Sequence, residues 1–238
     1  MATKIIYSDS GEAWKKYRDW ISQLAGRDLR LCEIGGGANP LLGLEEMREK
    51  GLQYNLLDIS EEELQKAPEG YRKIVMDASS PDFSVGEKFD LVFSKMLLEH
   101  IRDAKQFHQN VLKILADGGL AVHFFPTLYS LPFVANLLLP ETLALLFYNF
   151  FGRRDSYQHA KFPAYYRWCR GPLTAQIEKF QNLGYEVVEY RGFFGHFYFD
   201  RVQLLKKLER KAASYLLKHP SPLLTSYAFV VLRKPSRQ

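Results

Sequence analysis

The feature that most constrains the fold is an apolar segment that ends directly in three glycines. The segment, Leu29–Ile34, is apolar apart from Arg30 and Glu33, which is typical of a central parallel strand buried on both faces. The glycines, Gly35–Gly37, have no Cβ and tolerate positive φ, so the chain can turn sharply and approach a ligand closely. The sequence therefore predicts a buried strand followed by a tight turn beside a bound group.

The residues after this turn indicate which class of ligand it suits. Asn39 and Pro40 predict the N-terminus of a helix over 41–50, which would face the same place as the turn, as in a nucleotide site. A dinucleotide fold would require G-x-G-x-x-G here, whereas Pro40 stands in place of the third glycine. A strand-to-helix turn without any ligand is the alternative for this stretch taken alone.

The next two predicted strands each end in an acid. The first, over 52–58, ends in Asp58, which lies 21 positions after the last of the three glycines. A spacing of roughly 20 residues places a carboxylate on ribose hydroxyls in doubly wound folds. The second, over 71–76, is followed by Asp77 and Ala78. Either acid could instead cap a helix or close a turn.

The fourth predicted strand, F-D-L-V-F-S over 89–94, is followed by K-M-L-L-E-H. His100 ends this stretch and is the side chain in it that can exchange a proton near neutral pH. The alternative is that this histidine orients the following helix or binds a backbone carbonyl. A helix over 103–116 and a fifth strand over 120–125 continue the alternation of strands and helices.

Two of these patterns resemble those of a known enzyme family. Glu33-x-Gly35-x-Gly37 is similar to the first motif of class I S-adenosylmethionine-dependent methyltransferases. F-D-L-V-x-S followed by L-x-E-H is similar to the signature of their small-molecule members (methyltransferase type 11), including quinone-biosynthesis-like enzymes. The resemblance covers residues 29–125 and implies a Rossmann-like fold with S-adenosylmethionine as cofactor.

The resemblance also implies roles for particular residues. The glycine turn would hold the methionine end of the cofactor, Asp58 its ribose, and Asp77 with Ala78 its adenine. Cofactor and acceptor would meet at Ser94–Met96, and His100, from its proton chemistry, is the candidate catalytic base beside them. The predicted cofactor site consists of Glu33, Gly35, Gly36, Gly37, Asp58, Ile59, Asp77, Ala78, Ser94, Lys95 and Met96.

The whole pattern predicts one methyltransferase domain over 1–238 with an α/β fold. Two further strands, over 185–190 and 226–232, complete a doubly wound, Rossmann-like sheet of seven strands, mostly parallel with an antiparallel last strand. An apolar and aromatic insertion over 127–171 is expected to form a helical lid over the acceptor. A second insertion, over 196–220, precedes the last strand, and residues 192–199 are expected to form an aromatic loop beside the lid.

Composition narrows the partners and the compartment. Lys and Arg number 32 and Asp and Glu 27, a net charge of +5, but no long basic run predicts nucleic-acid binding. Cys32 and Cys169 predict free thiols in a reducing compartment, and no Cys/His spacing suggests a metal. Without a long apolar segment at the N-terminus, a cytoplasmic protein is expected. Peripheral membrane contact through 131–151 or the basic helix over 200–218 stays open, whereas the prolines in the first segment disfavour a membrane span.

The implied reaction is in-line transfer of a methyl group to a small or lipid-linked acceptor, at oxygen. No N-P-P-Y follows the fourth strand and no Pro-Cys pair occurs, which disfavours adenine, glutamine and cytosine as acceptors. His100 is the first candidate base, with His123, His196 and Tyr198 behind it. The alternatives are an NAD(P)-dependent oxidoreductase and a non-catalytic protein that binds a membrane surface. The sequence predicts neither the acceptor nor the oligomeric state.

Overall fold

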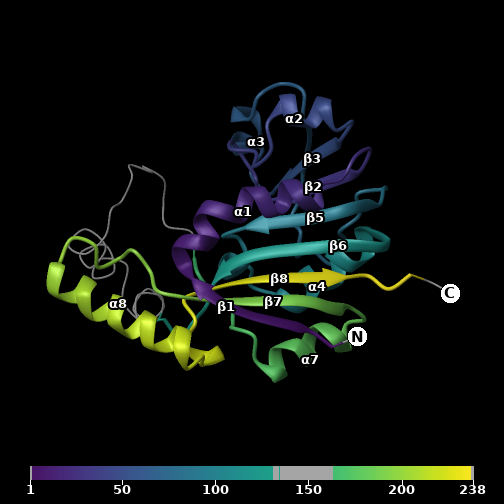
Figure 1. The fold of residues 1–238 in the computed structure, drawn as a ribbon. Helices are drawn as coiled ribbons and strands as arrows, with labels where there is room; N and C mark the ends of the chain where they lie inside the picture. The colour runs from purple at the N-terminus through teal and green to yellow at the C-terminus, as the bar shows by residue number, and fades with distance from the viewer. Residues whose placement is uncertain (1, 131–133, 135–162, 237–238) are drawn as a thin grey trace.

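The protein forms a single eight-stranded sheet in the order β1-β7-β8-β6-β5-β2-β3-β4 (Figure 1). The structure is a computed structural model that describes residues 2–130, 134 and 163–236. The strands are β1 (Lys4–Asp9), β2 (Arg30–Ile34), β3 (Gln53–Asp58), β4 (Arg72–Val75), β5 (Phe89–Lys95), β6 (Leu115–Pro126), β7 (Glu186–Phe194) and β8 (Tyr227–Arg233). The helices are α1 (Ser10–Leu24), α2 (Leu44–Glu49), α3 (Glu61–Lys66), α4 (Ala104–Ile114), α7 (Thr174–Asn182) and α8 (Gln203–Lys218), with short 3₁₀ helices η1 (Leu98–His100) and η2 (Pro222–Leu224).

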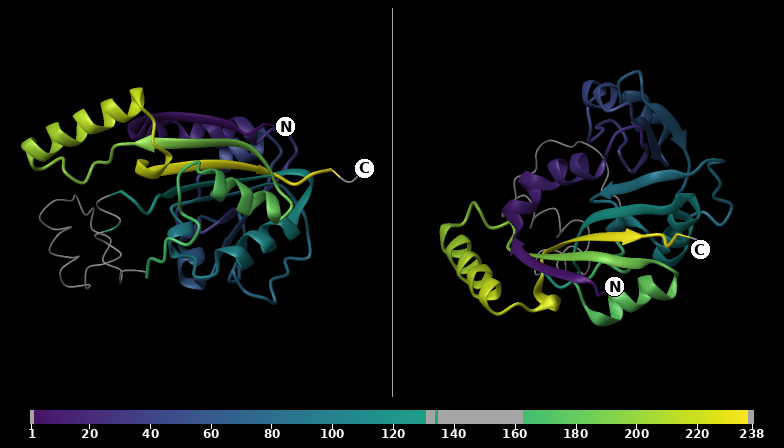
Figure 2. Two further views of the ribbon diagram at one scale, coloured as in Figure 1. Left: turned by 90° about the horizontal axis from the view of Figure 1, so that it is seen from below. Right: turned by 45° about the vertical axis from the view of Figure 1, so that its right-hand side comes forward.

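The topology confirms the predicted doubly wound sheet. All neighbouring strands are parallel except β8, which is antiparallel to both β6 and β7. Helices α1 and α2 lie on one face of the sheet, and α4 and α7 lie on the other (Figure 2). Because the parallel strands all end at one edge, their carboxyl ends bring together the segments that follow them.

The eighth strand, β1, was not predicted. It pairs in parallel with β7, for example Lys4 with Glu189 and Asp9 with Phe194. Six residues near the N-terminus with a weak alternation give little local signal for a strand. Their strand conformation comes from pairing with a segment that is distant in the sequence.

The helix after the glycine turn begins later than predicted. α2 starts at Leu44, so the prediction that Asn39 and Pro40 begin this helix is wrong. The residues between the turn and α2 stay close to the end of β2, because the backbone amide of Leu41 donates to the carboxylate of Glu33 at 3.0 Å. That side-chain contact overrides the local preference for a helix start.

The predicted aromatic loop over 192–199 is also shorter. Gly192, Phe193 and Phe194 extend β7, and Phe193 pairs with Tyr227 of β8. A side chain at Gly192 would collide with its neighbours, since a Cβ there would lie 2.6 Å from the Cγ2 of Thr225. The close packing of this strand explains the glycine, which the sequence alone placed in a loop.

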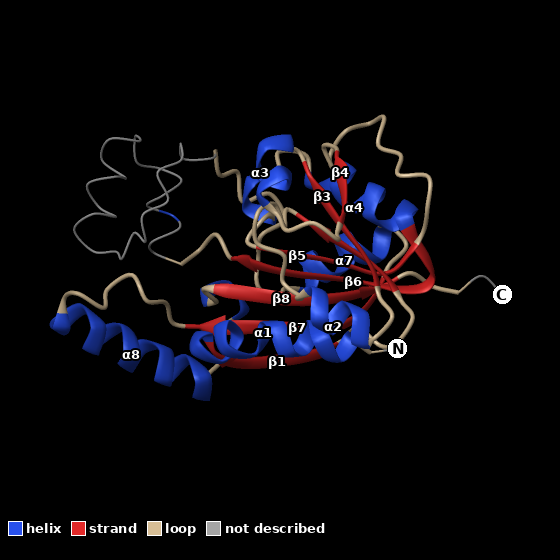
Figure 3. Ribbon diagram, turned by 90° about the horizontal axis from the view of Figure 1, so that it is seen from above, coloured by secondary structure: helices blue, strands red, loops and turns tan. Residues whose placement is uncertain are grey.

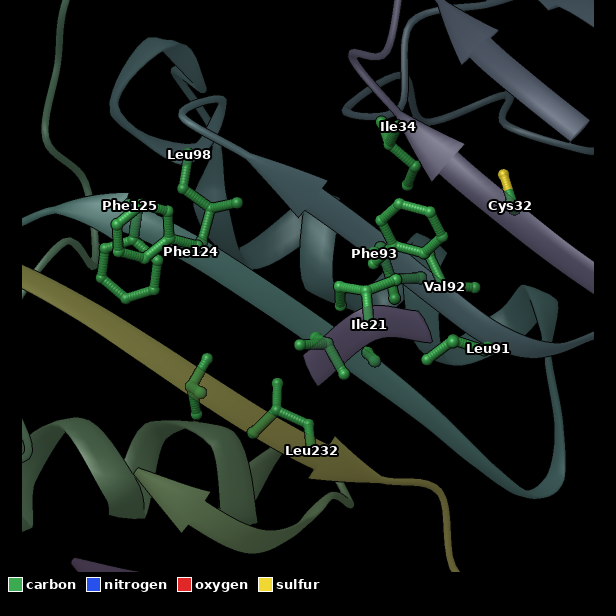
Figure 4. Close-up of a cluster of buried hydrophobic side chains, with 14 of the residues drawn as sticks. Ile21, Cys32, Ile34, Leu91, Val92, Phe93, Leu98, Phe124, Phe125 and Leu232 are labelled. Atoms are coloured by element: carbon green, nitrogen blue, oxygen red, sulfur yellow. The ribbon is translucent and has the colours of Figure 1, made fainter. Parts of the chain in front are cut away.

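The core is apolar on both faces of the central strands. Leu91, Val92 and Phe93 are consecutive in β5 and all buried, so both faces are covered, as expected for a parallel sheet between helices. Ile21 of α1 and Leu232 of β8 belong to the same cluster (Figure 4). This packing gives the strand ends a rigid support.

Most of the predicted lid lies outside the described residues. Residues 131–133 and 135–162 are not described, so the expected helical lid and the segment 131–151 are not tested. The described part, 163–171, contains no helix and lies beside the chain that follows β6, where the amide of Leu128 donates to the carbonyl of Cys169 at 3.0 Å. Among the helices that the structure describes, none combines the length and apolar character needed to cross a membrane.

Candidate functional site

The glycine turn lies at the carboxyl end of β2 and needs its glycines. Gly35 and Gly37 have φ of +78° and +43°, in the left-handed region that favours glycine. Gly36 packs directly on Glu33, because a Cβ there would lie 2.8 Å from the Cδ of the glutamate. The backbone of the turn therefore rests on the carboxylate beneath it.

Glu33 is a buried acid below this turn. Its side chain accepts hydrogen bonds from the hydroxyl of Tyr54 and from the amide of Leu41, and the residue is 4% exposed. Burial raises the pKa of Glu33 to about 7, while these hydrogen bonds and the nearby charge of Lys95 act in the opposite direction. The site thus has a buried carboxyl that a cationic group would bring to its ionised form.

Asp58 lies at the end of β3, next to the same turn. A Cβ on Gly37 would lie 3.4 Å from the Oδ2 of Asp58, and the Oδ1 accepts from the amide of Ser60 at 2.9 Å. Burial raises the pKa of Asp58, and hydrogen bonds from neighbouring backbone amides, including that of Gly37, lower it. Ile59 follows with its side chain exposed. The predicted glycine turn and two of the predicted acids, Glu33 and Asp58, are brought together, and Glu63 of α3 also contacts the turn.

Asp77 and Ala78 lie one strand further along the sheet. The amide of Met76 donates to the carbonyl of Asp58 at 2.9 Å, which joins this segment to the end of β3. The Oδ1 of Asp77 accepts from both the amide and the hydroxyl of Ser79 at 2.7 Å, so the exposed acid closes a turn, as the alternative interpretation held. Ala78 is buried.

The end of β5 and the residues after it also lie beside the glycine turn, since a Cβ on Gly35 would lie 3.0 Å from the Cδ1 of Leu97. Ser94 is buried, and its hydroxyl is 2.8 Å from the Nδ1 of His123, so this side chain is engaged with β6. The ammonium of Lys95 lies 5.1 Å from the ring centre of Trp14 in α1. Met96 has φ of +52°, which is uncommon for a residue with a side chain and is found where surrounding contacts enforce it, often at functional sites.

His100 is placed by a segment far away in the sequence. Its Nδ1 is 2.9 Å from the carbonyl oxygen of Pro163. Because a carbonyl only accepts hydrogen bonds, Nδ1 carries the proton in neutral His100 and Nε2 carries the lone pair. Burial lowers the pKa of His100, which favours this neutral form near pH 7. The carbonyl contact foreseen as an alternative is present, and it leaves the basic nitrogen as Nε2.

Sequence reasoning missed Glu99, the neighbour of this histidine. Glu99 is 4% exposed, and within the described part of the chain its Oε2 has no hydrogen-bond partner. Its Oε1 lies 3.8 Å from the Nε2 of His100, and burial raises the pKa of Glu99 to about 8. The signal in the sequence was the acid directly before histidine in L-x-E-H. A buried carboxyl oxygen without a hydrogen-bond partner is costly, which makes Glu99 a candidate for function.

The other three candidate bases, His123, His196 and Tyr198, have strongly shifted pKa values. Burial lowers the pKa of His123 to about 3 and of His196 to about 4, and raises that of Tyr198 to about 12. His123 also stays engaged with Ser94. Proton exchange near neutral pH therefore favours His100 over these three.

Comparison with known proteins decides the family. Residues 10–212 match the sequence profile of a methyltransferase domain family. The chain belongs to this family. The predicted class I S-adenosylmethionine-dependent methyltransferase is thereby confirmed for family and fold, which disfavours the oxidoreductase alternative. None of the curated protein sequences compared with this methyltransferase matches it.

Solved structures share the fold of this methyltransferase at low sequence identity. An S-adenosylmethionine-dependent methyltransferase from Mesorhizobium loti is 15% identical with a TM-score of 0.56, over 94% of this chain and 99% of the other. Phosphoethanolamine N-methyltransferase 2 from Haemonchus contortus, in complex with S-adenosyl-L-methionine, is 18% identical with a TM-score of 0.57, over 94% and 53%. The [4+2]-cyclase SpnF is 15% identical with a TM-score of 0.57, over 96% and 83%. The likeness shows the fold, and the cyclase illustrates that the fold alone does not determine the reaction.

Proposed function

We propose that this methyltransferase transfers a methyl group from S-adenosylmethionine to an oxygen of a small or lipid-linked acceptor at the carboxyl edge of the sheet. The observation that carries the proposal is the packing of the glycine turn between two acids, with Gly36 on Glu33 and Gly37 on Asp58. Strand-end carboxylates beside a turn without side chains suit a ligand that combines a cation with ribose hydroxyls.

The residues present fit this cofactor. Glu33 and Gly35–Gly37 would hold its cationic methionine end, because Glu33 is a buried carboxyl in contact with the turn. Asp58 and Ile59 would hold the ribose, and Asp77 with Ala78 would hold the adenine. Ser94, Lys95 and Met96 would border the reacting end through their backbone, since the hydroxyl of Ser94 is engaged with His123. When bound, the cofactor supplies an electrophilic methyl group on a sulfonium.

The chain itself contributes position and a proton acceptor. Orienting the acceptor and excluding water at the rigid strand ends is worth about 7–11 kcal/mol when the geometry is good. The carbonyl of Pro163 holds His100 with its lone pair on Nε2, and this nitrogen takes the proton that the acceptor hydroxyl loses. Glu99, 3.8 Å from Nε2, stabilises the imidazolium when its own carboxyl is ionised, which its raised pKa of about 8 places at alkaline pH.

A lipid-linked acceptor is supported by exposed aromatic residues in the segments that follow β6 and Pro163. Tyr165 is exposed, and its amide donates to the carbonyl of Glu99 at 2.6 Å, so its backbone lies beside the residue that precedes the candidate base. Tyr129, exposed after the end of β6, packs against Arg170 with the guanidinium carbon 4.9 Å from the ring centre. Aromatic and cationic groups of this kind suit an apolar acceptor with an anionic headgroup.

Calorimetric titration of the full chain tests the cofactor part of the proposal. S-adenosylmethionine and S-adenosylhomocysteine are expected to bind, and NAD is not. Asp58→Ala should weaken both ligands, whereas Val75→Ala, an exposed change on the edge strand β4, should leave them unchanged. Binding of NAD without binding of the sulfonium would favour the oxidoreductase. Absence of binding for all three would favour the non-catalytic membrane-binding protein.

A further inference from the structure

Helix α8 lies at the same edge of the sheet as the candidate site. Figures 1 and 3 both show it beyond the ends of the strands, at the side toward which β5 points. It packs against β1 and β7, where Gly195 follows β7. A Cβ on Gly195 would lie 3.5 Å from the Cβ of Ala213 in α8. The helix is therefore attached at the carboxyl ends of the strands.

One face of α8 is directed toward the domain. Ala213 is buried, and the carboxylate of Glu209 accepts from the amide of His196 at 2.8 Å. The outward face carries Leu204, Leu208 and Tyr215, which are 67%, 55% and 63% exposed. Their spacings of four and seven residues place them in one row along the helix. A row of large apolar side chains thus faces away from the core.

Lysines accompany this row along its whole length. Lys207, Lys211 and Lys218 each follow one of the apolar residues by three positions, so they lie on the same side of the helix, and all are exposed. Within the described part of the chain, the ion pair of this helix joins Lys206 to Asp200, and these three lysines have none. The outward face is therefore both apolar and uniformly positive.

Further exposed apolar residues flank the helix in the sequence. Phe197 precedes it, and Leu223 and Leu224 follow it in η2, all with exposed side chains. Single exposed hydrophobic residues are ordinary, but a run of them over one segment marks a surface that contacts another phase or partner.

We propose that the outward face of α8 docks on an anionic lipid bilayer, with Leu204, Leu208 and Tyr215 entering the interface and the lysines at the lipid phosphates. An amphipathic helix that combines apolar residues with lysines has the chemistry of such a surface. A second copy of this face would oppose lysines to lysines, which disfavours a symmetric dimer. A nucleic acid would leave the leucines without a partner.

This docking would direct the carboxyl edge of the sheet toward the membrane. An acceptor carried by a lipid could then reach the site without leaving the bilayer. Only this last consequence rests on the proposed function, because vesicle binding needs neither cofactor nor acceptor.

Co-sedimentation of the full chain with vesicles tests the inference. The protein is expected to bind phosphatidylcholine vesicles that contain phosphatidylglycerol, and to bind pure phosphatidylcholine vesicles much more weakly. Leu204→Gln with Leu208→Gln should lower the partition coefficient at least about tenfold. Lys207→Gln with Lys211→Gln should lower it about thirtyfold at low salt, and added salt should reduce this difference.

Matched controls separate docking from general effects. Val75→Gln removes an exposed aliphatic residue at the opposite edge of the sheet, and Lys105→Gln with Lys113→Gln removes two exposed lysines from α4. Both controls should bind vesicles as the wild type does, and circular dichroism should show all variants folded. The inference is overturned if the wild type binds no vesicles, if it binds both kinds equally, or if the α8 variants bind like the controls. It is also overturned if the α8 variants only convert a dimer to a monomer in gel filtration.

Discussion

The two halves of the candidate site are built in different ways. The glycine turn and Asp58 follow neighbouring strands, and each contact joins segments that a spacing rule connects, such as Gly37 with Asp58. His100 and Glu99 are held by a distant segment, through Pro163 and the amides of Tyr165 and Tyr166. We call the glycine turn with Asp58 the cofactor half of the candidate site, and His100 with Glu99 the acceptor half. The cofactor half can therefore be predicted from local sequence patterns. The acceptor half depends on contacts with residues 163–166, which are distant in the sequence.

The most severe test of this comparison removes the base in the acceptor half. His100→Ala should lower turnover by about 10²–10⁴-fold, because the acceptor hydroxyl loses its proton acceptor. Affinity for S-adenosylhomocysteine should stay near that of the wild type, since His100 lies outside the glycine turn. Steady-state kinetics and calorimetry measure the two quantities. Equal loss of both would mean that the two halves are not separate.

The cofactor half is tested by substituting one glycine of the turn with alanine, which adds one methyl group. Gly36→Ala places a Cβ against the buried carboxylate of Glu33, which two hydrogen bonds hold in place. We expect an affinity for S-adenosylhomocysteine about a hundredfold lower, since overpacking of this kind costs about 3 kcal/mol. Gly43→Ala is the matched control, because a Cβ there meets nothing within 4 Å and φ is −77°. Similar affinities for the two variants would show that the turn does not touch the ligand.

Glu99 tests whether the acceptor half contains a coupled pair. Above about pH 8, where Glu99 is ionised, Glu99→Gln should lower turnover about tenfold, the effect of destabilising the imidazolium of His100 by about one pKa unit. Affinity for the cofactor product should not change. A variant as active as the wild type would leave Glu99 a purely structural residue.

The same substitution has an opposite effect on stability. Burial raises the pKa of Glu99 from its ordinary value of 4.5 to about 8, so the folded protein holds a proton that the unfolded chain releases in this range. The wild type therefore loses stability from this group as pH rises through this window. Glu99→Gln carries no charge and does not lose this stability. Its free energy of unfolding should therefore rise relative to that of the wild type as pH increases from 4.5 to about 8. Denaturant unfolding at several pH values measures the difference, and a constant difference would contradict the assignment.

A smaller effect on stability is expected where residues 163–171 pack against α4. The ring of Trp168 stacks on His108 with centroids 5.6 Å apart, and burial lowers the pKa of His108 well below its ordinary value. A buried neutral histidine costs stability as pH falls below about 6.5, because the unfolded chain then binds the proton. His108→Phe keeps an aromatic ring and removes this proton, so it should lose less stability than the wild type between pH 6.5 and 5. Parallel pH dependences of the free energy of unfolding would argue against this effect.

The sequence predicts the cofactor half because its proposed ligand-binding residues follow the ends of successive strands. Gly35–Gly37, Asp58 and the segment after β5 follow buried strands whose periodicity is strong, so their convergence follows from the fold class. Glu33 held by Tyr54 was not visible, because that hydrogen bond joins side chains of two strands. β1 was missed for the related reason that pairing with β7, not local propensity, makes it a strand.

For the acceptor half, the sequence predicted that a histidine is the base but not how this side chain is held. The motif L-x-E-H indicated His100, but its tautomer depends on Pro163, and the burial of Glu99 depends on the chain that returns over it. Such contacts are long in sequence separation and carry no fixed spacing. They are visible only once the chain is folded.

A crystal structure of the full chain with S-adenosylhomocysteine tests the central claim most directly. We predict the ribose on the carboxylate of Asp58 and the amino-acid end against Gly35–Gly37 above Glu33. A ligand bound away from these residues, with the glycine turn facing solvent, would contradict the account.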